Sequence, residues 1–356
     1  MNRIEINKLI EQMKNNINSF NYSPEILNKM DNIMNTNEKY KQMILKVVIY
    51  KNNITYHNVY GETRKKHIIF MFNHMKKYII NSGKQLPNLI AYFYICDVYT
   101  REYQDLPFFV FAKPQNRNGI LFPDNTFFCH LFENKCENWD TIKKIVINKC
   151  NSISIKDKID EMYFKGANTG KDKHNLRYML SQEKKLPLTV KIFENYTPMY
   201  SFCKYKYLLN LPGHQPWSYR FKYLFLMNSL VINVSVIKHY TDNEKLEKND
   251  KWLSFFDIIM VPDTDYIDIE YNWYENKDNL DEYKKYNLDE YNKLINKLDD
   301  VYKYYNSKPE EYKSMVTSGF NKINSITYEF VLEMLYDLLV RYSYKLDPFI
   351  DKIIKK

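Results

Sequence analysis

The feature that most constrains this fold is a series of short apolar runs, each followed by polar or proline-containing sequence. Three of them follow one another: LIAYFYICD at 89–97, LPFFVFAKP at 106–114 and ILFPDNTFF at 120–128. Apolar runs without polar alternation are typical of strands buried on both faces of a parallel sheet. An amphipathic stretch precedes them at 63–83, with Gly83 as the expected C-terminal cap. This alternation of strands and helices predicts an α/β fold.

The same alternation returns in the second half of the chain. Strands are predicted at 162–164, 186–195, 204–213 and 230–237, and helices at 217–229, 287–306 and 325–346, in addition to a strand pair at 43–61. The character of the sequence changes near residues 154–160, where we place a domain boundary. The expected organisation is an N-terminal domain at 1–157, a second domain at 158–325 and a C-terminal helix at 326–356 that packs back on the fold.

The net charge is +9, but lysine and arginine are spread along the chain with acidic residues between them. A nucleic-acid-binding chain usually gathers its basic residues into a patch, so no specific nucleic-acid partner is expected. Binding driven by the charge surplus stays as an alternative, which a steep salt dependence would support. The richness in Asn, Lys, Ile and Tyr is typical of an AT-rich genome, such as that of a large DNA virus.

The cysteines are Cys96, Cys129, Cys136, Cys150 and Cys203. They are odd in number and form no Cys-x-x-Cys pair, which disfavours a disulfide framework or zinc site and favours a reducing compartment. The N-terminal sequence has no apolar signal-peptide core, and no run approaches about 20 apolar residues. We therefore expect a cytoplasmic protein without a membrane span.

The first candidate for phosphate binding follows the strand predicted at 204–213. The strand leads into a loop at Gly213, and the helix predicted next opens with Ser218, Tyr219, Arg220 and Lys222. Unpaired N–H groups and the positive dipole end of a helix attract anions, and two cations there make sense beside an anion. The alternative is a solvated surface turn.

The second candidate is the loop in MYFKGANTGKDK, after the strand-like residues MYF. Gly166 and Gly170 would let backbone amides approach a ligand closely, beside Ala167, Asn168 and Lys173. The spacing does not satisfy the Walker A pattern, so an ordinary strand-to-helix loop is the alternative.

Acidic residues offer two further candidates. Asp97 ends an apolar run, at the sheet edge where ligands gather in open α/β folds, and a carboxylate there can accept the proton of an attacking hydroxyl. Asp263 and Asp265 form an Asp-x-Asp sequence like that of metal-dependent transferases, so a GT-A-like enzyme is an alternative. The histidines lack metal-ligand spacing, and no nucleophile elbow is present.

Several motifs together resemble glycosyltransferase family 90, which contains the Rumi-like protein O-glucosyltransferases and the capsule-associated xylosyltransferases. The stretch KYKYLLNLPG and the following WSYRFKYLFLMNSLVI are similar to the family's Lys-Tyr-Lys-Tyr strand and Ser-x-Arg-Phe-Lys segment. The segments ICDVY with LPFFVFAKP, ILFPDNTFF, MYFKGANTG and WLSFF stand in the family's order. The similarity runs from about residue 88 to residue 272.

The resemblance implies a GT-B fold, in which two Rossmann-like domains face each other across a cleft. It also implies an inverting transfer of a sugar, glucose or xylose, from a UDP-sugar to a hydroxyl of a protein or glycan acceptor, without a metal or other cofactor. Asp97 would be the catalytic base. The residues that would bind the donor are Gly166, Ala167, Asn168, Lys173, Gly213, Ser218, Tyr219, Arg220 and Lys222.

The chain departs from the family in the loop that reads FKGA, where the family has Phe-Arg-Gly-Ser. Ala167 lacks a hydroxyl donor, and Asn168 stands where an arginine is common. Lys173 falls near a family arginine position, for which Arg177 is the rival under a one-residue shift. A degenerate protein that binds a nucleotide-sugar or glycan without turning it over is therefore an alternative.

Overall fold

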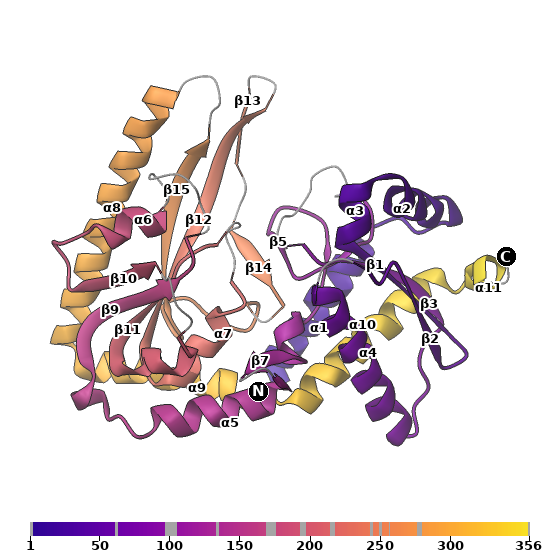
Figure 1. Ribbon diagram of the computed structural model, residues 1–356, viewed down its shortest axis with the longest axis horizontal. Coiled ribbons are helices and arrows are strands. Elements are labelled where there is room, and N and C mark those ends of the chain that lie inside the picture. The colour runs from indigo at the N-terminus through magenta and orange to yellow at the C-terminus, as the bar shows by residue number, and fades with distance from the viewer. Residues whose placement is uncertain are drawn as a thin grey trace.

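The computed structural model describes residues 3–60, 63–96, 105–132, 135–168, 176–192, 197–213, 218–242, 245–248, 251–255, 257–275 and 280–354. Two sheets stand side by side, one built from the first half of the chain and one from the second, each with helices against it (Figure 1). Strands and helices alternate in both halves, so the predicted α/β class is confirmed. The predicted domain boundaries and the facing GT-B arrangement stay predictions.

The first sheet has the order β2-β1-β3-β4-β6. Its strands are β1 (Ile44–Tyr50), β2 (Asn53–His57), β3 (Leu89–Tyr94), β4 (Phe109–Val110) and β6 (Ile120–Leu121). The strands β2, β1 and β3 pair antiparallel, whereas β3, β4 and β6 are parallel. Every residue of β3 is buried, as its unbroken apolar sequence predicts.

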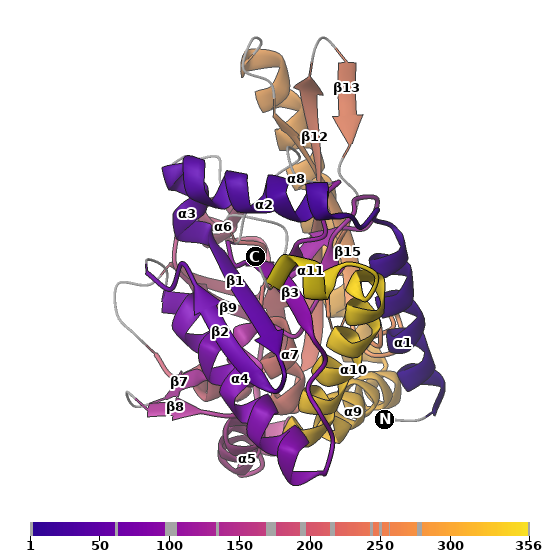
Figure 2. The same ribbon diagram turned by 90° about the vertical axis from the view of Figure 1, so that its right-hand side faces the viewer.

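The helices of this half are α1 (Arg3–Asn18), α2 (Pro24–Thr36), α3 (Glu38–Met43) and α4 (Thr63–Asn81), joined by α10 (Tyr328–Leu346) and α11 (Ile350–Ile354) from the C-terminus. Helix α10 contacts α4, α1 and β3, so the end of the chain returns to the first sheet (Figure 2). Gly83 follows α4 with a φ of 71°, the left-handed conformation expected of a C-terminal cap.

The second sheet has five parallel strands in the order β10-β9-β11-β12-β15. They are β9 (Ile159–Gly166), β10 (Leu188–Ile192), β11 (Tyr205–Asn210), β12 (Leu230–Asp242) and β15 (Ile267–Glu275), and β13 (Lys245–Lys248) pairs antiparallel with the end of β12. Along the chain these strands are second, first, third, fourth and fifth. In doubly wound sheets of this order, ligands bind where the order reverses, at the carboxyl ends of β9 and β11.

Helices of the second half pack on this sheet and connect it to the first half. They are α6 (Leu176–Ser181), α8 (Leu280–Ser307) and α9 (Pro309–Ser325), and α5 (Trp139–Cys150) precedes β9. Helix α8 lies against β15, while α5 and α9 both contact the short 3₁₀ turn η5 (Phe225–Met227). One buried apolar cluster contains residues of β1, β3, α5, α10 and η5, so both halves share a core.

A two-stranded sheet also joins the halves. Strand β5 (Ala112–Pro114) comes from the first half, and β14 (Trp252–Ser254) comes from the second. They pair antiparallel, and the backbone N–H of Gln115 donates to the carbonyl of Lys251 at 2.8 Å. Figure 1 shows this pair between the two larger sheets.

Two of the predicted elements are wrong in part. The helix predicted at 217–229 is only α7 (Phe221–Leu224) followed by η5, because Asn228 adopts a left-handed conformation with a φ of 52° and ends the turn. The run at 106–114 was predicted as one strand, but it forms β4 and β5, which belong to different sheets. The helix dipole argument for residues 218–222 therefore loses its basis, since a single turn has almost no macrodipole.

The cysteines were expected to form no disulfide framework, but one disulfide is present. Cys129 and Cys136 are joined by a disulfide. They lie on a small hairpin of β7 (His130–Phe132) and β8 (Lys135–Glu137), whose antiparallel pairing brings the two residues together despite their seven-residue separation. The cysteine argument for a reducing compartment no longer holds. In the part of the chain that the structure describes, every helix is too short or too polar to cross a membrane.

Candidate functional site

The carboxyl ends of β9 and β11 form a crevice that two arginines occupy. Arg177, on α6, donates through Nη1 to the carbonyl of Ala167 at 2.6 Å and through Nη2 to the carbonyl of Leu211 at 3.1 Å. Because these carbonyls follow β9 and β11, one guanidinium group holds both loops at the point where the strand order reverses.

Arg220 approaches the same crevice from the residue before α7. Its Nη1 donates to the carbonyl of Lys165 at 2.9 Å. Both guanidinium groups lie against the ring of Phe164, with the Cζ atom of Arg220 4.7 Å and that of Arg177 4.9 Å from the ring centroid. A Cβ atom at Gly166 would stand 2.8 Å from the Phe164 ring and 3.0 Å from Nη2 of Arg220, so the close approach requires glycine.

The positive charges of Arg177 and Arg220 favour binding of an anion in this crevice. Burial lowers the pKa of Arg177, and the charge of Arg220 lowers it further, to about 9. Burial also lowers the pKa of Arg220. Both groups stay charged at neutral pH, and two positive charges in a poorly solvated space repel each other. A phosphate or pyrophosphate group between them would relieve that repulsion.

The structure brings most of the predicted donor residues to this crevice. The carbonyl of Ala167 binds Arg177, the Oγ atom of Ser218 accepts from the backbone N–H of Arg220 at 3.3 Å, and a Cβ atom at Gly213 would lie 3.7 Å from Nη2 of Arg177. Asn168 and Tyr219 are exposed at its edge. Asp97 and Lys173 lie outside the described residues.

Lys222 has a different environment from the other predicted residues. Its ammonium group is fully buried and donates to Asp124 at 2.7 Å, to Thr126 at 2.7 Å and to the carbonyl of Tyr219 at 3.2 Å. These contacts use all three N–H bonds. Burial lowers the pKa of Lys222, and the charge of Asp124 opposes this shift. The geometry ties α7 to the first half of the chain and gives no support to a phosphate contact at Lys222.

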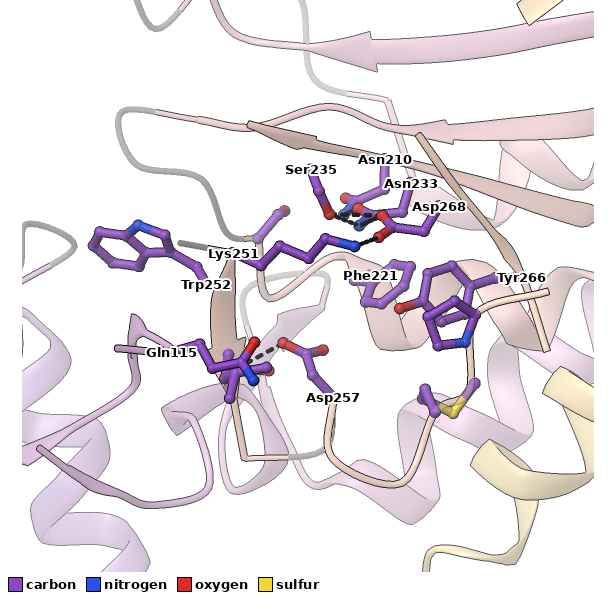
Figure 3. A pocket seen from close by; sticks show the side chains of 15 residues that line it. Gln115, Asn210, Phe221, Asn233, Ser235, Lys251, Trp252, Asp257, Tyr266 and Asp268 are labelled. Atoms are coloured by element: carbon purple, nitrogen blue, oxygen red, sulfur yellow. Dashed lines mark hydrogen bonds and ion pairs between the residues drawn. The ribbon is translucent and has the colours of Figure 1, made fainter. Parts of the chain in front are cut away.

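A cavity of about 280 Å³ lies beside the end of β11, and Asn210 and Ser218 are among its lining residues. It lies between the face of the second sheet and the β5–β14 pair (Figure 3). Polar side chains cover the sheet side, and Phe221, Trp252 and Tyr266 add aromatic surface. A mixture of hydrogen-bonding groups and aromatic faces suits a ligand with hydroxyl groups and C–H surfaces.

Asp268 organises the polar side of the cavity. Its Oδ1 accepts from Asn233 at 2.9 Å and from Ser235 at 2.6 Å, and its Oδ2 accepts from Lys251 at 2.7 Å. Lys251 also pairs with Glu270 at 2.9 Å. Burial works against the charged form of Lys251, but the hydrogen bonds and charges of its two carboxylate partners outweigh it and raise its pKa.

The carboxylate of Asp268 fixes the orientation of the side-chain amides of Asn233 and Asn210. An ionised carboxylate only accepts hydrogen bonds, so Asn233 must turn its Nδ2 group to Asp268. Its Oδ1 then accepts from Nδ2 of Asn210 at 2.7 Å. The remaining amide atom of Asn210, Oδ1, is buried and has no hydrogen-bond donor among the described residues.

Asp257 lies on the opposite side of the cavity, just after β14 (Figure 3). Its Oδ2 accepts from the backbone N–H of Ser254 at 2.7 Å, while its Oδ1 is covered and meets no donor within the described ranges. Burial raises the pKa of Asp257 to about 6; the hydrogen bonds from Ser254 and the charge of Lys222 oppose this shift, and the charge of Asp268 adds to it.

In the Asp-x-Asp sequence, the carboxylate of Asp265 already accepts hydrogen bonds from other groups of the protein. Its carboxylate accepts from the backbone N–H of Val261 at 2.7 Å, from Ser318 at 2.6 Å and from Lys322 at 2.5 Å. Asp265 is buried under α9, whereas Asp263 is exposed. The two carboxylates therefore do not converge. Within the ranges that the structure covers, no three His, Cys, Asp or Glu side chains form a group that could hold a metal ion.

Sequence reasoning anticipated one side of this site better than the other. Arg220 was predicted, and Arg177 was named as the rival of Lys173. The polar wall of the cavity was not predicted, although LVINVSVI carries a signal: Asn233 and Ser235 interrupt an apolar strand at alternate positions. Side chains two residues apart point to the same face of a strand, which marks a polar face in an otherwise buried sheet.

Comparison with known proteins gives a consistent result. The sequence model described as "Glycosyl transferase family 90" matches residues 25–328. The chain is similar to "Protein O-glucosyltransferase 1" of Homo sapiens, Bos taurus and Rattus norvegicus, each at 25% identity over 191 residues. The matched region covers 46% of this chain and 44% of each relative, so the similarity spans less than half the length of these relatives.

Proposed function

Since the chain belongs to glycosyl transferase family 90, we propose that it transfers a sugar from a UDP-sugar to a hydroxyl group of a protein or glycan acceptor. The observation that carries the proposal is the pair of buried guanidinium groups of Arg177 and Arg220 over one phenylalanine ring. They stand at the strand-order reversal of a doubly wound sheet, where a nucleotide pyrophosphate would be held.

In the proposed complex the pyrophosphate lies between the two arginines. Planar guanidinium groups bind phosphate oxygens in pairs, and the glycine at position 166 leaves room for the backbone to approach. The hydroxyl-bearing part of the donor extends into the cavity lined by Asn210 and Asp257. The acceptor approaches from the first half, in the facing arrangement of a GT-B enzyme.

The proposed reaction is a single displacement with inversion at the anomeric carbon. Asp97 removes the proton of the acceptor hydroxyl, which attacks opposite the leaving UDP. Negative charge builds up on the departing pyrophosphate, and the preorganised charges of Arg177 and Arg220 stabilise it. Because two fixed cations supply that stabilisation, we propose that the reaction needs no metal ion.

Glucose is the favoured sugar and xylose the second candidate. The similar relatives are named O-glucosyltransferases, which supports glucose. The two sugars differ by one hydroxymethyl group, a difference that a binding pocket discriminates by only about 1–3 kcal/mol.

The test is a thermal-shift screen with UDP, UDP-glucose, UDP-xylose and, as a control, ADP-glucose. A ligand at 100 times its Kd stabilises the native state by about 2.7 kcal/mol, so a clear rise in Tm is expected with the uridine compounds only. Release of UDP in the presence of EDTA and an acceptor would support metal-free transfer. No Tm change with any uridine compound would overturn the proposal.

A degenerate binding protein is the second candidate. The loop after β9 carries Ala167, which lacks a hydroxyl donor, and Asn168, which lacks a charge. The variant Asp97→Asn distinguishes the two candidates. In an enzyme, this variant keeps its affinity for the UDP-sugar and loses transfer. In a degenerate protein, neither the unmodified protein nor the variant turns over the donor.

A further inference from the structure

We propose that Asn210 and Asp257 form a two-point binding site for hydroxyl groups of the donor. Each contributes one acceptor oxygen, and the ligand supplies two O–H donors, from the ribose or from the transferred sugar. The inference rests on the proposed function and deepens it, because it assigns the cavity beside the arginines to the polyol part of a nucleotide-sugar.

The first argument is that both oxygens are buried acceptors that the described protein does not satisfy. Asn210 and Asp257 line one cavity, from β11 on one side and from the segment after β14 on the other, and the Oδ1 atom of each is buried without a donor among the described residues. Buried polar atoms are usually hydrogen-bonded, and leaving one unsatisfied is costly. Two such atoms on residues that line the same cavity indicate that a ligand completes them.

The second argument is that the protein presents both atoms as acceptors, that of Asp257 above its pKa of about 6. The carboxylate of Asp268 sets the orientation of Asn233, whose Oδ1 accepts a hydrogen bond from Nδ2 of Asn210. Asp257 receives the backbone N–H of Ser254 on its other oxygen. The complementary ligand group must therefore donate, as a hydroxyl does and a fully ionised phosphate does not.

The third argument is that the arginines and the cavity meet at the end of β11. Arg177 binds the carbonyl of Leu211, and the preceding residue, Asn210, lines the cavity together with Asp257, so positive charge adjoins a cavity with acceptor groups. A nucleotide-sugar has the same order of groups, since its pyrophosphate is flanked on both sides by rings that carry hydroxyls. Asn210 and Asp257 would then distinguish a donor with both hydroxyls from one that lacks them.

The ligand side of the test uses the unmodified protein. Calorimetric titrations compare UDP-glucose, UDP and 2′,3′-dideoxy-UDP. If the ribose is the partner, removal of its hydroxyls weakens binding about tenfold or more, whereas UDP and UDP-glucose bind alike. If the transferred sugar is the partner, UDP binds about tenfold or more weakly than UDP-glucose, and the dideoxy compound equals UDP. Equal affinity of all three ligands would overturn the proposal.

The protein side uses Asp257→Ala and Asn210→Ala, with Asp257→Asn as the conservative variant and Asp263→Asn as a matched exposed control. Both alanine variants should lose about tenfold or more in affinity for the full ligand and become less sensitive to removal of the hydroxyls, because each keeps only one of the two contacts. In Asp257→Asn the single oxygen takes the N–H of Ser254 and the Nδ2 donor faces the ligand hydroxyl, so this variant should lose affinity as Asp257→Ala does, while the exposed control Asp263→Asn should stay within about threefold of the unmodified protein.

Arg220→Ala separates this inference from the proposed function. If Arg220→Ala abolishes binding of UDP and UDP-glucose while the alanine variants at 210 and 257 bind normally, the hydroxyl site is refuted and the donor site stands. If Arg220→Ala binds both ligands normally, the proposed function itself fails.

Discussion

Arg220 and Arg177 illustrate how few side chains define the site. Both guanidinium groups are held by backbone carbonyls and by the ring of Phe164, so their positions are fixed before any ligand arrives. A fixed charge stabilises a developing anion without reorganisation during the reaction. Mutations at these positions should therefore act on turnover more than on folding.

We predict that Arg220→Ala lowers kcat/KM for sugar transfer by about 10²-fold or more, as loss of a single transition-state donor does elsewhere. Arg220→Lys should recover only part of it, because an ammonium group cannot bind two phosphate oxygens in a planar fork. Steady-state kinetics with a UDP-sugar donor check both variants. Near-normal turnover of Arg220→Ala would contradict the assignment.

Asp257 gives a prediction for stability and pH. Its pKa is raised to about 6 from 3.8, so the native state binds this proton more tightly than the unfolded state does. The contribution of this tighter proton binding to the free energy of unfolding is fully present below about pH 4 and is lost as pH rises through 6. Asp257→Asn stays neutral throughout, so it should be more stable than the unmodified protein by about 1–3 kcal/mol at pH 8.

Urea unfolding at pH 5, 6.5 and 8 measures this difference. The advantage of Asp257→Asn should be largest at pH 8 and shrink toward pH 5. The charged groups that act on Asp257 are Asp268, which raises its pKa, and Lys222, which lowers it. An advantage of the same size at all three pH values would mean that Asp257 is not the titrating group.

Individual residues differed in how well the sequence predicted them. Arg220 could be found because it lies in a motif of adjacent residues. Asn210 and Asp257 could not, because their shared cavity depends on Asp268 and Ser254, which lie on other strands. The partner of a buried polar group is set by tertiary structure, and a single sequence contains no direct record of it.

At the level of secondary structure elements, the buried pair of Lys222 and Asp124 joins α7 to the segment after β6. The two groups are 2.7 Å apart, with 0% and 3% of their side chains exposed. Such a pair is weak evidence for net stability, but removal of one partner leaves an uncompensated buried charge. The pair therefore fixes the position of α7, which begins directly after Arg220, relative to the first half.

We predict that Lys222→Met lowers the free energy of unfolding by about 3–5 kcal/mol, and that adding Asp124→Asn restores part of this loss. The matched control is Lys303→Met, which breaks an exposed pair with Asp299 and should cost less than about 1 kcal/mol. Equilibrium urea unfolding measures all three variants. Equal losses in Lys222→Met and the control would show that the buried pair does not position α7.

Helices and strands could be predicted where a local pattern of apolar residues marks them. Strands β3 and β11 and helices α4 and α10 have continuous apolar patterns and were predicted close to their observed bounds. The β5–β14 pair was not predicted, because three-residue strands carry almost no pattern and their partner lies far along the chain. The helix at 217–229 was overestimated because its composition is that of a buried segment, which periodicity alone cannot assign to a helix or an irregular turn.

On the scale of the whole molecule, one apolar cluster spans both halves, and the second half has a further cluster of its own. Trp139 and Lys143 on α5 both donate to the carbonyl of Ile326, at 2.8 Å each, between α9 and α10. The same apolar cluster includes Tyr163 and Leu208 of the second sheet. The halves are therefore energetically coupled even though each has its own sheet.

We predict a single cooperative thermal transition, with equal calorimetric and van't Hoff enthalpies. A UDP-sugar that binds the second half should raise this one Tm and leave no early unfolding step of the first half. Differential scanning calorimetry with and without ligand checks the prediction. Two transitions, of which only one moves with ligand, would show that the halves unfold independently.

The strand pair β5–β14 has a consequence for how substrates come and go. It stitches one half to the other by backbone hydrogen bonds directly beside the cavity. Separation of the halves at this point would break these hydrogen bonds, so we expect the cavity to keep its width when a ligand binds or leaves. A ligand would then enter and leave by diffusion, without a hinge motion of the two halves.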